Sequence, residues 1–265
     1  MRMMSIASGS SGNCIYIGTD NAHVLVDAGI SKKKIVEGLK LLDLSLDDID
    51  AIVVTHEHDD HIRGIGVVER QSMTPVYGTN GTLEYIKCYQ PLGKLPEGIY
   101  HPVIPGDDFM IKDLRISPVS ISHDAVDPVA YVFSKDDKRI GVLTDIGYYD
   151  DNILESFQNL NAMLIESNHD VNMLMTGPYP YPLKQRILGN RGHLSNESCG
   201  RMLGELLNDK LESVLLGHLS KENNFPDLAY ETVRMEINLS DSPYKADDFN
   251  ICVAGRDKPS DIISI

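Results

Sequence analysis

The stretch that decides the fold is Ile52-Val53-Val54-Thr55-His56-Glu57-His58-Asp59-Asp60-His61, where an apolar run leads directly into three histidines and three acids. Such an apolar run is typical of a strand buried on both faces. A helix that begins near Asp60 would carry Ile62, Ile65 and Val68 inward. Imidazole suits zinc, iron or manganese, and carboxylate adds charge for a hard cation. We therefore expect a metal site at a strand end; the alternative, a surface run that chelates incidentally, fits poorly between two apolar elements.

Composition sets the frame for this site. The chain has 265 residues, of which 42% are hydrophobic, so we expect a single domain over residues 1–265 with a sizeable core. The net charge of −15 argues against a broad basic surface that binds nucleic acid, but not against an enzyme with a few local cations. No apolar stretch suits a membrane span or signal peptide, so we expect a cytoplasmic protein without membrane contact.

The four cysteines are far apart in sequence and form no CxxC pair: Cys14, Cys88, Cys199 and Cys252. This pattern predicts free thiols and neither a disulfide framework nor a zinc ribbon. Any metal must then be held by histidine and carboxylate.

Strand and helix patterns alternate along the chain, which predicts an α/β fold. Strands are expected at 14–18, 23–27, 49–55, 75–77, 109–111, 114–119, 129–133, 139–144, 162–166, 213–218 and 250–254. Helices are expected from Ser31 to Leu42, from Asp60 onward, from Ser195 to Leu207 and from Asp227 to Ile237. Asp136-Asp137 is expected to be a hairpin turn.

Five motifs follow one another in a familiar order. His56-Glu57-His58-Asp59-Asp60-His61 matches the pattern HxHxDH, and the other four are Leu25-Val26-Asp27-Ala28-Gly29, Ser122-His123-Asp124, Leu143-Thr144-Asp145-Ile146-Gly147 and Leu216-Gly217-His218. Together they resemble the metallo-β-lactamase superfamily from about residue 8 to 220. The resemblance implies a four-layer αβ/βα sandwich, in which helices flank two mixed β-sheets.

The resemblance also implies two divalent metal ions, with Mn²⁺ and Zn²⁺ as the first candidates and Fe²⁺ as a third. One ion would be held by His56, His58 and His123, the other by Asp60, His61 and His218, and Asp145 would bridge them. Two cations lower the pKa of a water that they share and so provide the nucleophile. Asp60, as an implied ligand of one of these cations, is therefore also expected to be a catalytic residue. Asp27 is expected to orient a ligand histidine; the alternative is an aspartate that caps a helix or turn.

Glu166 and His193 lie between the bridging aspartate and the last histidine. Phosphodiesterase branches of the superfamily carry a similar pair, which implies that Glu166 orients His193 and that His193 is the general acid. The alternative is a structural histidine near a helix N-terminus. His169 is expected to support the site or contact substrate, or only to hydrogen-bond within its loop.

Longer segments resemble the YycJ/WalJ/VicX group of bacterial superfamily members. They are Ser8–Asn13, Glu166–Asp170, Gly177–Pro180, Leu183–Ile187 and Gly192–Asn196. That group is associated with 5′→3′ DNA exonuclease activity and DNA repair. The resemblance therefore implies a partner that is DNA, as an end or a short single strand.

Local charge bears on the substrate. Between Val171 and Leu203 four cations (Lys184, Arg186, Arg191 and Arg201) face one acid, Glu197. Lys184, Arg186 and Arg191, with Ser195 and Asn196, are expected to bind substrate phosphates; a solvated helix face is the alternative. Tyr179 and Tyr181 either stack on a base or stiffen a packed loop.

Two other functions are alternatives, and the first of them would use the same ligand set. One is a small-molecule hydrolase, such as a lactonase, thioesterase or cyclic phosphodiesterase. The other is a regulatory binding partner of a two-component system, which the intact ligand set disfavours. The short separation of Asp145 from His218 predicts that no β-CASP insert is present.

Overall fold

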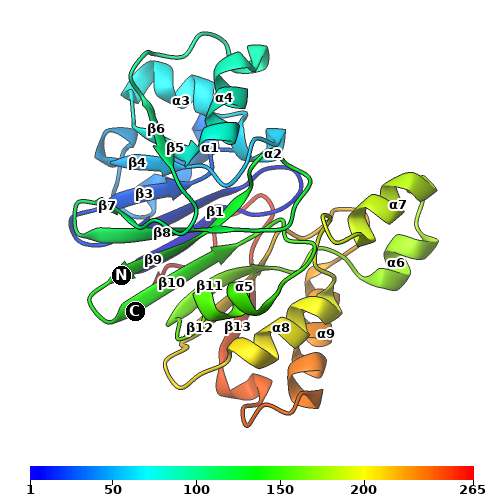
Figure 1. Ribbon diagram of the computed structural model, residues 1–265. Coiled ribbons are helices and arrows are strands. Elements are labelled where there is room, and N and C mark those ends of the chain that lie inside the picture. The colour runs from blue at the N-terminus through cyan, green and yellow to red at the C-terminus, as the bar shows by residue number, and fades with distance from the viewer.

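Two seven-stranded sheets form the centre of the computed structural model, which describes residues 1–265 (Figure 1). In the first sheet the order is β14 (Ile263–Ser264), β1 (Arg2–Ala7), β2 (Cys14–Gly18), β3 (His23–Val26), β4 (Ala51–Val53), β5 (Val76–Thr79), β6 (Tyr100–Val103). In the second it is β13 (Asn250–Val253), β12 (Ser213–Gly217), β11 (Ala162–Glu166), β10 (Lys138–Leu143), β9 (Val129–Lys135), β8 (Leu114–Ser120), β7 (Phe109–Ile111).

Both sheets are mixed. In the first sheet β14, β1, β2 and β3 pair antiparallel, and β3 to β6 pair parallel. In the second sheet β7 to β10 pair antiparallel, and β10 to β13 pair parallel. The parallel strands β3, β4, β10, β11 and β12 precede the polar motifs, so their carboxyl ends can bring those motifs to one region.

Helices cover the outer face of each sheet (Figure 1). The first sheet packs against α1 (Lys32–Lys40), α3 (Ile65–Ser72) and α4 (Asn80–Cys88), and the second against α5 (Asp151–Ser156), α8 (Asn196–Leu206) and α9 (Pro226–Leu239). A third apolar cluster fills the space between the two sheets. Three apolar layers between four structural layers confirm the predicted αβ/βα sandwich.

Local chemistry explains the element ends that the sequence predicted. The Ser31 side chain caps α1 by accepting from the Lys34 N–H, and Ser195 caps α8 in the same way through Ser198. All four cysteines are free, as expected. None of the helices has the length and apolarity needed to cross a bilayer.

The helix predicted from near Asp60 does begin there, and Ile62, Ile65 and Val68 are buried as expected, but it is not continuous. The segment divides into α2 (Asp59–Ile62) and α3, with Gly64 at the junction. Gly64 packs directly on backbone, because an added Cβ would lie 2.2 Å from the Ile30 carbonyl and 2.6 Å from that of Ala28. The close approach holds the metal-motif segment against the end of β3.

A two-helix arm, residues 171–191, was not anticipated. It contains α6 (Val171–Thr176) and α7 (Tyr181–Leu188) and projects from the body at the end where the motifs gather (Figure 1). No residue of α7 is buried. The arm therefore contributes little to the core, and its exposed residues can contact a molecule that binds beside the polar motifs.

Glu69 of α3 carries a buried carboxyl without a partner. The residue is 0% exposed, neither carboxyl oxygen has a hydrogen-bond partner, and burial raises its pKa from 4.5 to about 8. Between these values the folded protein holds a proton that the unfolded chain releases, so the free energy of unfolding falls as pH rises through this window.

We expect Glu69→Leu to raise the free energy of unfolding near pH 8 by about 1–3 kcal/mol, because it removes an unsatisfied buried polar group. The gain should shrink toward pH 5, because this pH is close to the pKa of 4.5 of the unfolded chain and most of the pH-dependent loss of stability occurs above it. Denaturant unfolding at the two pH values measures this difference. Glu97→Gln in an exposed loop is the control, and an equal gain for Glu69→Leu at both pH values would contradict the argument.

Candidate metal centre

Several polar side chains follow directly on the carboxyl ends of the parallel strands. Asp27 follows β3, Asp145 lies two residues past β10 and His218 follows β12. These three residues have φ values of 61°, 58° and 55°, in the left-handed region that non-glycine residues seldom adopt. This unusual backbone conformation turns the chain sharply at each of the three residues, so that their side chains point into one shared space.

The first group in this space consists of three imidazoles. His56 Nε2 lies 3.0 Å from His58 Nδ1, and His123 Nε2 lies 3.3 Å from the same atom. Ring nitrogens of all three side chains therefore converge. Neutral imidazole nitrogens arranged in this way are suitable ligands for a divalent cation.

The second group consists of Asp60, His61 and His218. Asp60 Oδ2 lies 3.6 Å from His61 Nε2 and 3.4 Å from His218 Nε2. Candidate ligand atoms within each group lie no more than 4.8 Å apart. The group combines two imidazoles with one carboxylate, the donor set that zinc and manganese accept.

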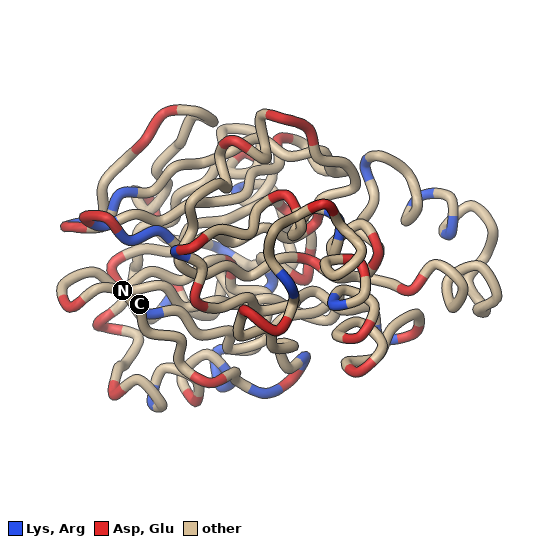
Figure 2. The backbone as a smooth tube through the Cα atoms, turned by 90° about the horizontal axis from the view of Figure 1, so that it is seen from below, with Lys and Arg blue, Asp and Glu red and all other residues tan.

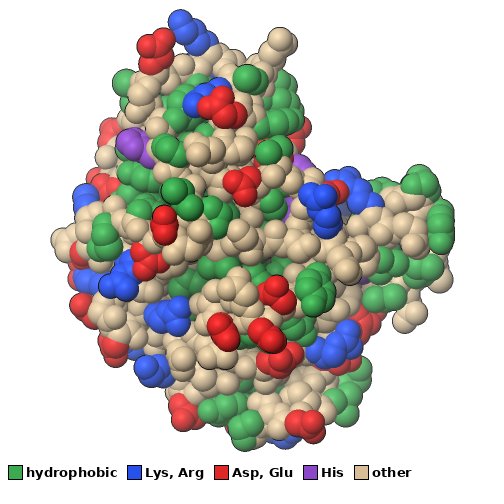
Figure 3. All heavy atoms as spheres, viewed as in Figure 1, with side chains coloured by type: hydrophobic (Ala, Val, Ile, Leu, Met, Phe, Trp, Pro, Cys, Tyr) green, Lys and Arg blue, Asp and Glu red, His purple; other side chains and the backbone are tan.

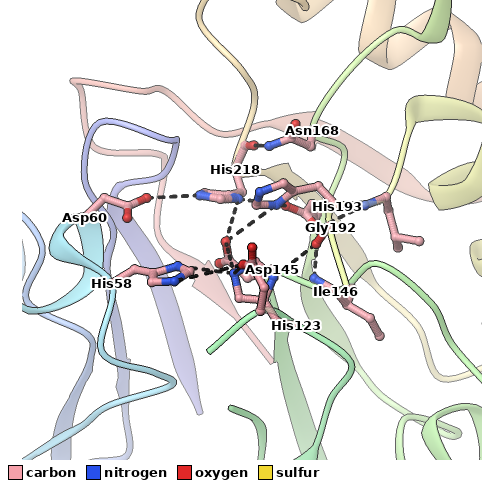
Figure 4. Close-up of polar contacts among 12 residues, drawn as sticks. His58, Asp60, His123, Asp145, Ile146, Asn168, Gly192, His193 and His218 are labelled. Carbon is pink, nitrogen blue, oxygen red and sulfur yellow. Dashed lines mark hydrogen bonds and ion pairs between the residues drawn. The ribbon is translucent and has the colours of Figure 1, made fainter. Parts of the chain in front are cut away.

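Asp145 lies between the two groups, and Figure 4 shows His58, Asp60, His123, His193 and His218 around it. Its Oδ2 is 3.2 Å from His61 Nε2, and its Oδ1 is 3.8 Å from His123 Nε2. Oδ2 is buried and has no hydrogen-bond partner. A buried carboxylate whose two oxygens lie near imidazoles of the two groups, one of these oxygens being unpartnered, is suited to bind divalent cations.

Each of three candidate ligand histidines is oriented through its other ring nitrogen. His61 Nδ1 lies 2.7 Å from Asp27 Oδ2, His123 Nδ1 lies 3.1 Å from the Gly192 carbonyl, and His218 Nδ1 lies 2.7 Å from Glu166 Oε1. In every case Nε2 is left to face the shared space. Such partners fix the tautomer and ring direction of a metal ligand.

Asp27→Asn is expected to weaken binding of the second cation by about 10–100-fold, the usual cost of losing such a partner. Asp27 also accepts from the backbone N–H and hydroxyl of Thr55 at 2.8 and 2.9 Å, so an amide nitrogen would face a donor in either orientation. Competition with a chromophoric chelator measures the affinity. Asp20→Asn, in an exposed turn, is the control. Two unchanged binding constants in Asp27→Asn would exclude an orienting role.

Glu166 lies at the end of β11, where four donors surround its carboxylate. Oε1 accepts from His193 Nδ1 at 2.8 Å and from His218 Nδ1 at 2.7 Å. Oε2 accepts from the backbone N–H groups of Ile146 and Leu194 at 3.0 and 3.2 Å. With its acceptor capacity used, Glu166 orients the two histidines and is not free to bind a metal.

The ionisation of this pair follows from the same contacts. Burial alone would raise the pKa of Glu166, but the hydrogen bonds and charges of His193 and His218 lower it to about 2. Burial alone would lower the pKa of His193, but Glu166 raises it above its usual value. The structure therefore holds a histidine that retains its proton, with Nε2 free, beside the metal groups.

His169 is placed otherwise. It is 1% exposed, and its Nδ1 lies 3.3 Å from the Asn168 side chain. Burial lowers its pKa to about 4, so it is neutral at physiological pH. The structure shows no side-chain hydrogen bond from His169 to Glu166 or to a candidate ligand, and its contact with Asn168 fits the loop-bonding alternative.

The structure places two of the predicted substrate-binding residues in the scaffold, where both are buried. Asn196 is 0% exposed, and its amide oxygen accepts from the Ser167 hydroxyl and from the Asn224 amide. Ser195 is 7% exposed and caps α8. Both side chains point into packed structure because the β11–α8 region needs their polar atoms to satisfy buried backbone and side-chain groups.

The predicted cations have individual positions. Lys184 Nζ donates to the Met175 and Gly177 carbonyls at 2.7 and 2.8 Å and so holds the bend of the arm. Arg191 Nε donates to the His123 carbonyl at 3.0 Å. Arg186 pairs with Asp124, and Arg201 pairs with Glu236 on a different helix. Of the four, only Arg186 lines the cavity above the metal groups.

That cavity has a volume of about 240 Å³ and lies between the metal groups and the arm. Its floor includes His58, Asp145 and His193, and its arm side includes Tyr179 and Arg186. Figure 3 shows histidine side chains in the hollow where the arm meets the body, beside a group of Lys and Arg side chains. A polar substrate can therefore reach both His193 and a cation of the arm.

The motifs did not identify all contributors. Asn13 Nδ2 lies 3.1 Å from His61 Nε2, and Ser8 Oγ accepts from the His218 N–H at 2.9 Å. The Thr55 hydroxyl lies 3.0 Å from His56 Nδ1. The Ser8–Asn13 loop was noted for its resemblance, but no spacing rule tied it to the metal motifs.

Comparison with known proteins agrees with this geometry. The beta-lactamase superfamily domain matches residues 22–218. Exodeoxyribonuclease WalJ of Streptococcus pneumoniae serotype 2 is 42% identical over 236 residues, which cover 89% of this chain and 88% of that protein. Exodeoxyribonuclease YycJ of Bacillus anthracis is 37% identical over 228 residues, which cover 86% of each.

Solved structures show the same fold at low identity. The metallo-beta-lactamase fold protein YhfI from Bacillus subtilis aligns with a TM-score of 0.70 and 16% identity over 98% of both chains. Human tRNase Z, short form, aligns with a TM-score of 0.66 and 14% identity over 100% of this chain and 99% of that one. At these identities the likeness concerns architecture only.

Proposed function

The chain belongs to the metallo-β-lactamase superfamily, and from this we propose that it is a dinuclear metal-dependent exodeoxyribonuclease that degrades DNA from a 5′ end and takes part in DNA repair. The observation that carries the proposal is the identity of 42% and 37% to two exodeoxyribonucleases over nearly nine-tenths of the chain. The Glu166–His193 pair beside the metal groups supports phosphodiester chemistry in particular.

The proposed ligands are His56, His58 and His123 for one cation, Asp60, His61 and His218 for the other, and Asp145 between them. When bound, two such cations would offset phosphate charge and lower the pKa of a water held between them. Mn²⁺ and Zn²⁺ are the proposed ions, with Fe²⁺ as a third, because the donors are imidazoles and carboxylates. Divalent cations are also what the unpartnered Asp145 oxygen fits.

His193 supplies the proton in this proposal. A leaving 3′-oxygen of deoxyribose is a strong base and departs readily only when it is protonated. Glu166 holds the proton of His193 on Nδ1 when the ring is neutral, and the raised pKa of His193 favours the doubly protonated ring whose Nε2–H is the donor. Asp145 Oδ1, at 3.6 Å from His193 Nδ1, adds negative charge on the same side.

Phosphate positioning is assigned to the arm. Residues 171–191 include Lys184, Arg186 and Arg191 and no acid, and Figure 2 shows blue segments and no red ones on the projecting helices. The chain as a whole is acidic, with a net charge of −15, so DNA contact depends on local groups of cations such as this arm. Without a β-CASP insert, a strand end or short single strand is the expected substrate, and a cytoplasmic site of action forms part of the proposal.

End-labelled substrates test the proposal. Single- and double-stranded DNA and RNA, with 5′-phosphate or 5′-hydroxyl ends, are incubated with the purified protein and Mn²⁺ or Zn²⁺. Release of mononucleotides from the 5′ end of DNA is the expected result. Cleavage of RNA alone would overturn the substrate assignment, and cleavage of none of them would favour the small-molecule hydrolase.

A further inference from the structure

A second cavity lies close to the catalytic one and is lined by cations. It has a volume of about 570 Å³, and its nine lining residues include Lys32, Lys33, Lys34 and Arg63 but no acid. Three separate segments form it: the beginning of α1, the α2–α3 junction and the Ser8–Asn13 loop. In a chain of net charge −15, four cations around one hollow without an acid among them are a concentrated exception.

The beginning of α1 is electrostatically unfavourable as it stands. The positive end of the helix dipole favours acids, yet the first turn has three consecutive lysines and no acid. Lys33 has only a long contact to Glu37 at 3.9 Å, and Lys32 bonds to the neutral Gln71 side chain. A charge arrangement that opposes the dipole is relieved by a bound anion, which the free N–H groups of the first turn would also favour.

Arg63 supports the same conclusion from another segment. Its Nε donates to the Gly29 carbonyl at 2.6 Å and its guanidinium also contacts the Ser11 carbonyl, so the group is held in one direction. No acid pairs with it. A guanidinium fixed by neutral carbonyls keeps its full charge and several donors for a phosphate.

The acid that pairs with Lys34 is itself surrounded by cations. Asp257 pairs with Lys34 at 2.6 Å, and Lys34, followed by the charges of Arg256 and Lys221, lowers its pKa. The carboxylate therefore neutralises only part of a larger positive region. That region continues beside the Ser8–Asn13 loop, because Arg256 lies against Gly9.

The two cavities share this loop. Ser10 lines the catalytic cavity and Ser11, the next residue, lines the cationic one. Asp60 lines the catalytic cavity, and Arg63 lies less than one helical turn after it. A polymer whose scissile phosphate lies at the metal groups can therefore place neighbouring phosphates over Arg63 and the lysines of α1.

We propose that the cavity lined by Lys32, Lys33, Lys34 and Arg63 is a second binding site for the phosphodiester backbone, which holds the part of the DNA strand that is not being cleaved. The site rests on the proposed nuclease function and extends it. It gives affinity without reading sequence, because its donors are ammonium and guanidinium groups directed at phosphate. Together with the arm it places cations on opposite sides of the catalytic cavity.

Lys32→Glu/Lys33→Glu tests this site. Glutamates in the first turn of α1 suit the helix dipole, so the variant should fold at least as well as the natural protein. At low salt we expect KM for a long single-stranded oligonucleotide to rise by about tenfold. The slope of log KM against log[salt] should fall by about 0.7 for each phosphate contact that is removed. Hydrolysis of bis(p-nitrophenyl) phosphate, which is too short to reach α1, should be unchanged.

Lys138→Glu/Lys210→Glu is the matched control. It changes the net charge by the same amount, but near the amino-terminal ends of β10 and β12, whereas the candidate metal ligands follow the carboxyl ends of these strands. If both double variants raise KM equally, only net charge matters and the site is disproved. An oligonucleotide KM that stays unchanged in Lys32→Glu/Lys33→Glu also disproves it, while DNA cleavage by the natural protein would still support the nuclease. Binding of a labelled oligonucleotide can also be followed by fluorescence anisotropy. If the natural protein does not cleave DNA, and if both variants bind the oligonucleotide as the natural protein does, both proposals are disproved.

Discussion

His193→Ala should reduce the rate of DNA hydrolysis by about 10²–10⁴-fold, the usual contribution of a positioned general acid. The same variant should lose much less activity on bis(p-nitrophenyl) phosphate, because p-nitrophenolate leaves without a proton. The difference between the two substrates is the decisive readout. It separates proton donation from a general loss of activity, which would lower both rates equally.

Metal content is the necessary control for His193→Ala. His193 lies within 4.8 Å of Asp145, Glu166 and His218 through atoms that could in principle bind a cation. We expect the variant to retain the metal content of the natural protein, because Nδ1 of His193 is hydrogen-bonded to Glu166 and is not available to bind a metal. A loss of metal together with equal losses on both substrates would reassign His193 as a ligand.

Much of the fold was predictable because its strands are buried on both faces. The apolar runs at β4, β10, β11 and β12 can be recognised without structural information, and Ser31 and Ser195 mark helix starts by chemistry that acts within three residues. The edge strand β14 and the half-exposed strand β6 were missed because they lack such runs. β1 was missed for a different reason. It is buried, but it is followed at once by a Ser/Gly-rich loop, and the short segment before this loop was not recognised as a strand.

The candidate ligands were predictable from motif order, whereas the surroundings depend on tertiary contacts. Nothing local in the sequence indicates that Asn13 approaches His61, since 48 residues separate them. Ser195 and Asn196 were assigned to substrate because they follow His193, but the chain turns inward there to begin α8. Whether a polar residue faces solvent or scaffold is decided by such turns, which spacing does not encode.

The arm shows the same limit. Its cations were counted correctly, but Lys184 and Arg191 bond to carbonyls and Arg186 to Asp124. The cavity on α1 was overlooked because Lys32, Lys33 and Lys34 form no motif and Arg63 is distant in sequence. Electrostatic sites built from several segments become visible only when the segments are placed together.

Glu166→Gln should have a larger effect than the loss of His193, because one carboxylate orients two histidines. Its Oε1 accepts from both imidazole Nδ1 atoms and its Oε2 from the N–H groups of Ile146 and Leu194. Glutamine has the same shape but only one acceptor oxygen. Its NH₂ group must face either the two imidazoles or the two backbone donors.

Either orientation damages the site. If the NH₂ faces the imidazoles, His218 must accept at Nδ1 and carry its proton on Nε2, the atom that faces Asp60 and the proposed second cation. If it faces the backbone, two buried N–H groups lose their acceptor, at about 1–3 kcal/mol each. The first outcome removes a metal ligand, and the second destabilises the loop that carries His193.

We therefore expect Glu166→Gln to bind about one cation per chain in place of the two proposed for the natural protein. It should also lose activity on bis(p-nitrophenyl) phosphate as well as on DNA, by about 10³-fold or more. Elemental analysis after dialysis and rates on both substrates measure this. Glu155→Gln, at an exposed position of α5, is the control. If Glu166→Gln keeps both cations and loses only DNA hydrolysis, as His193→Ala should, then Glu166 acts through His193 alone and does not maintain the metal centre.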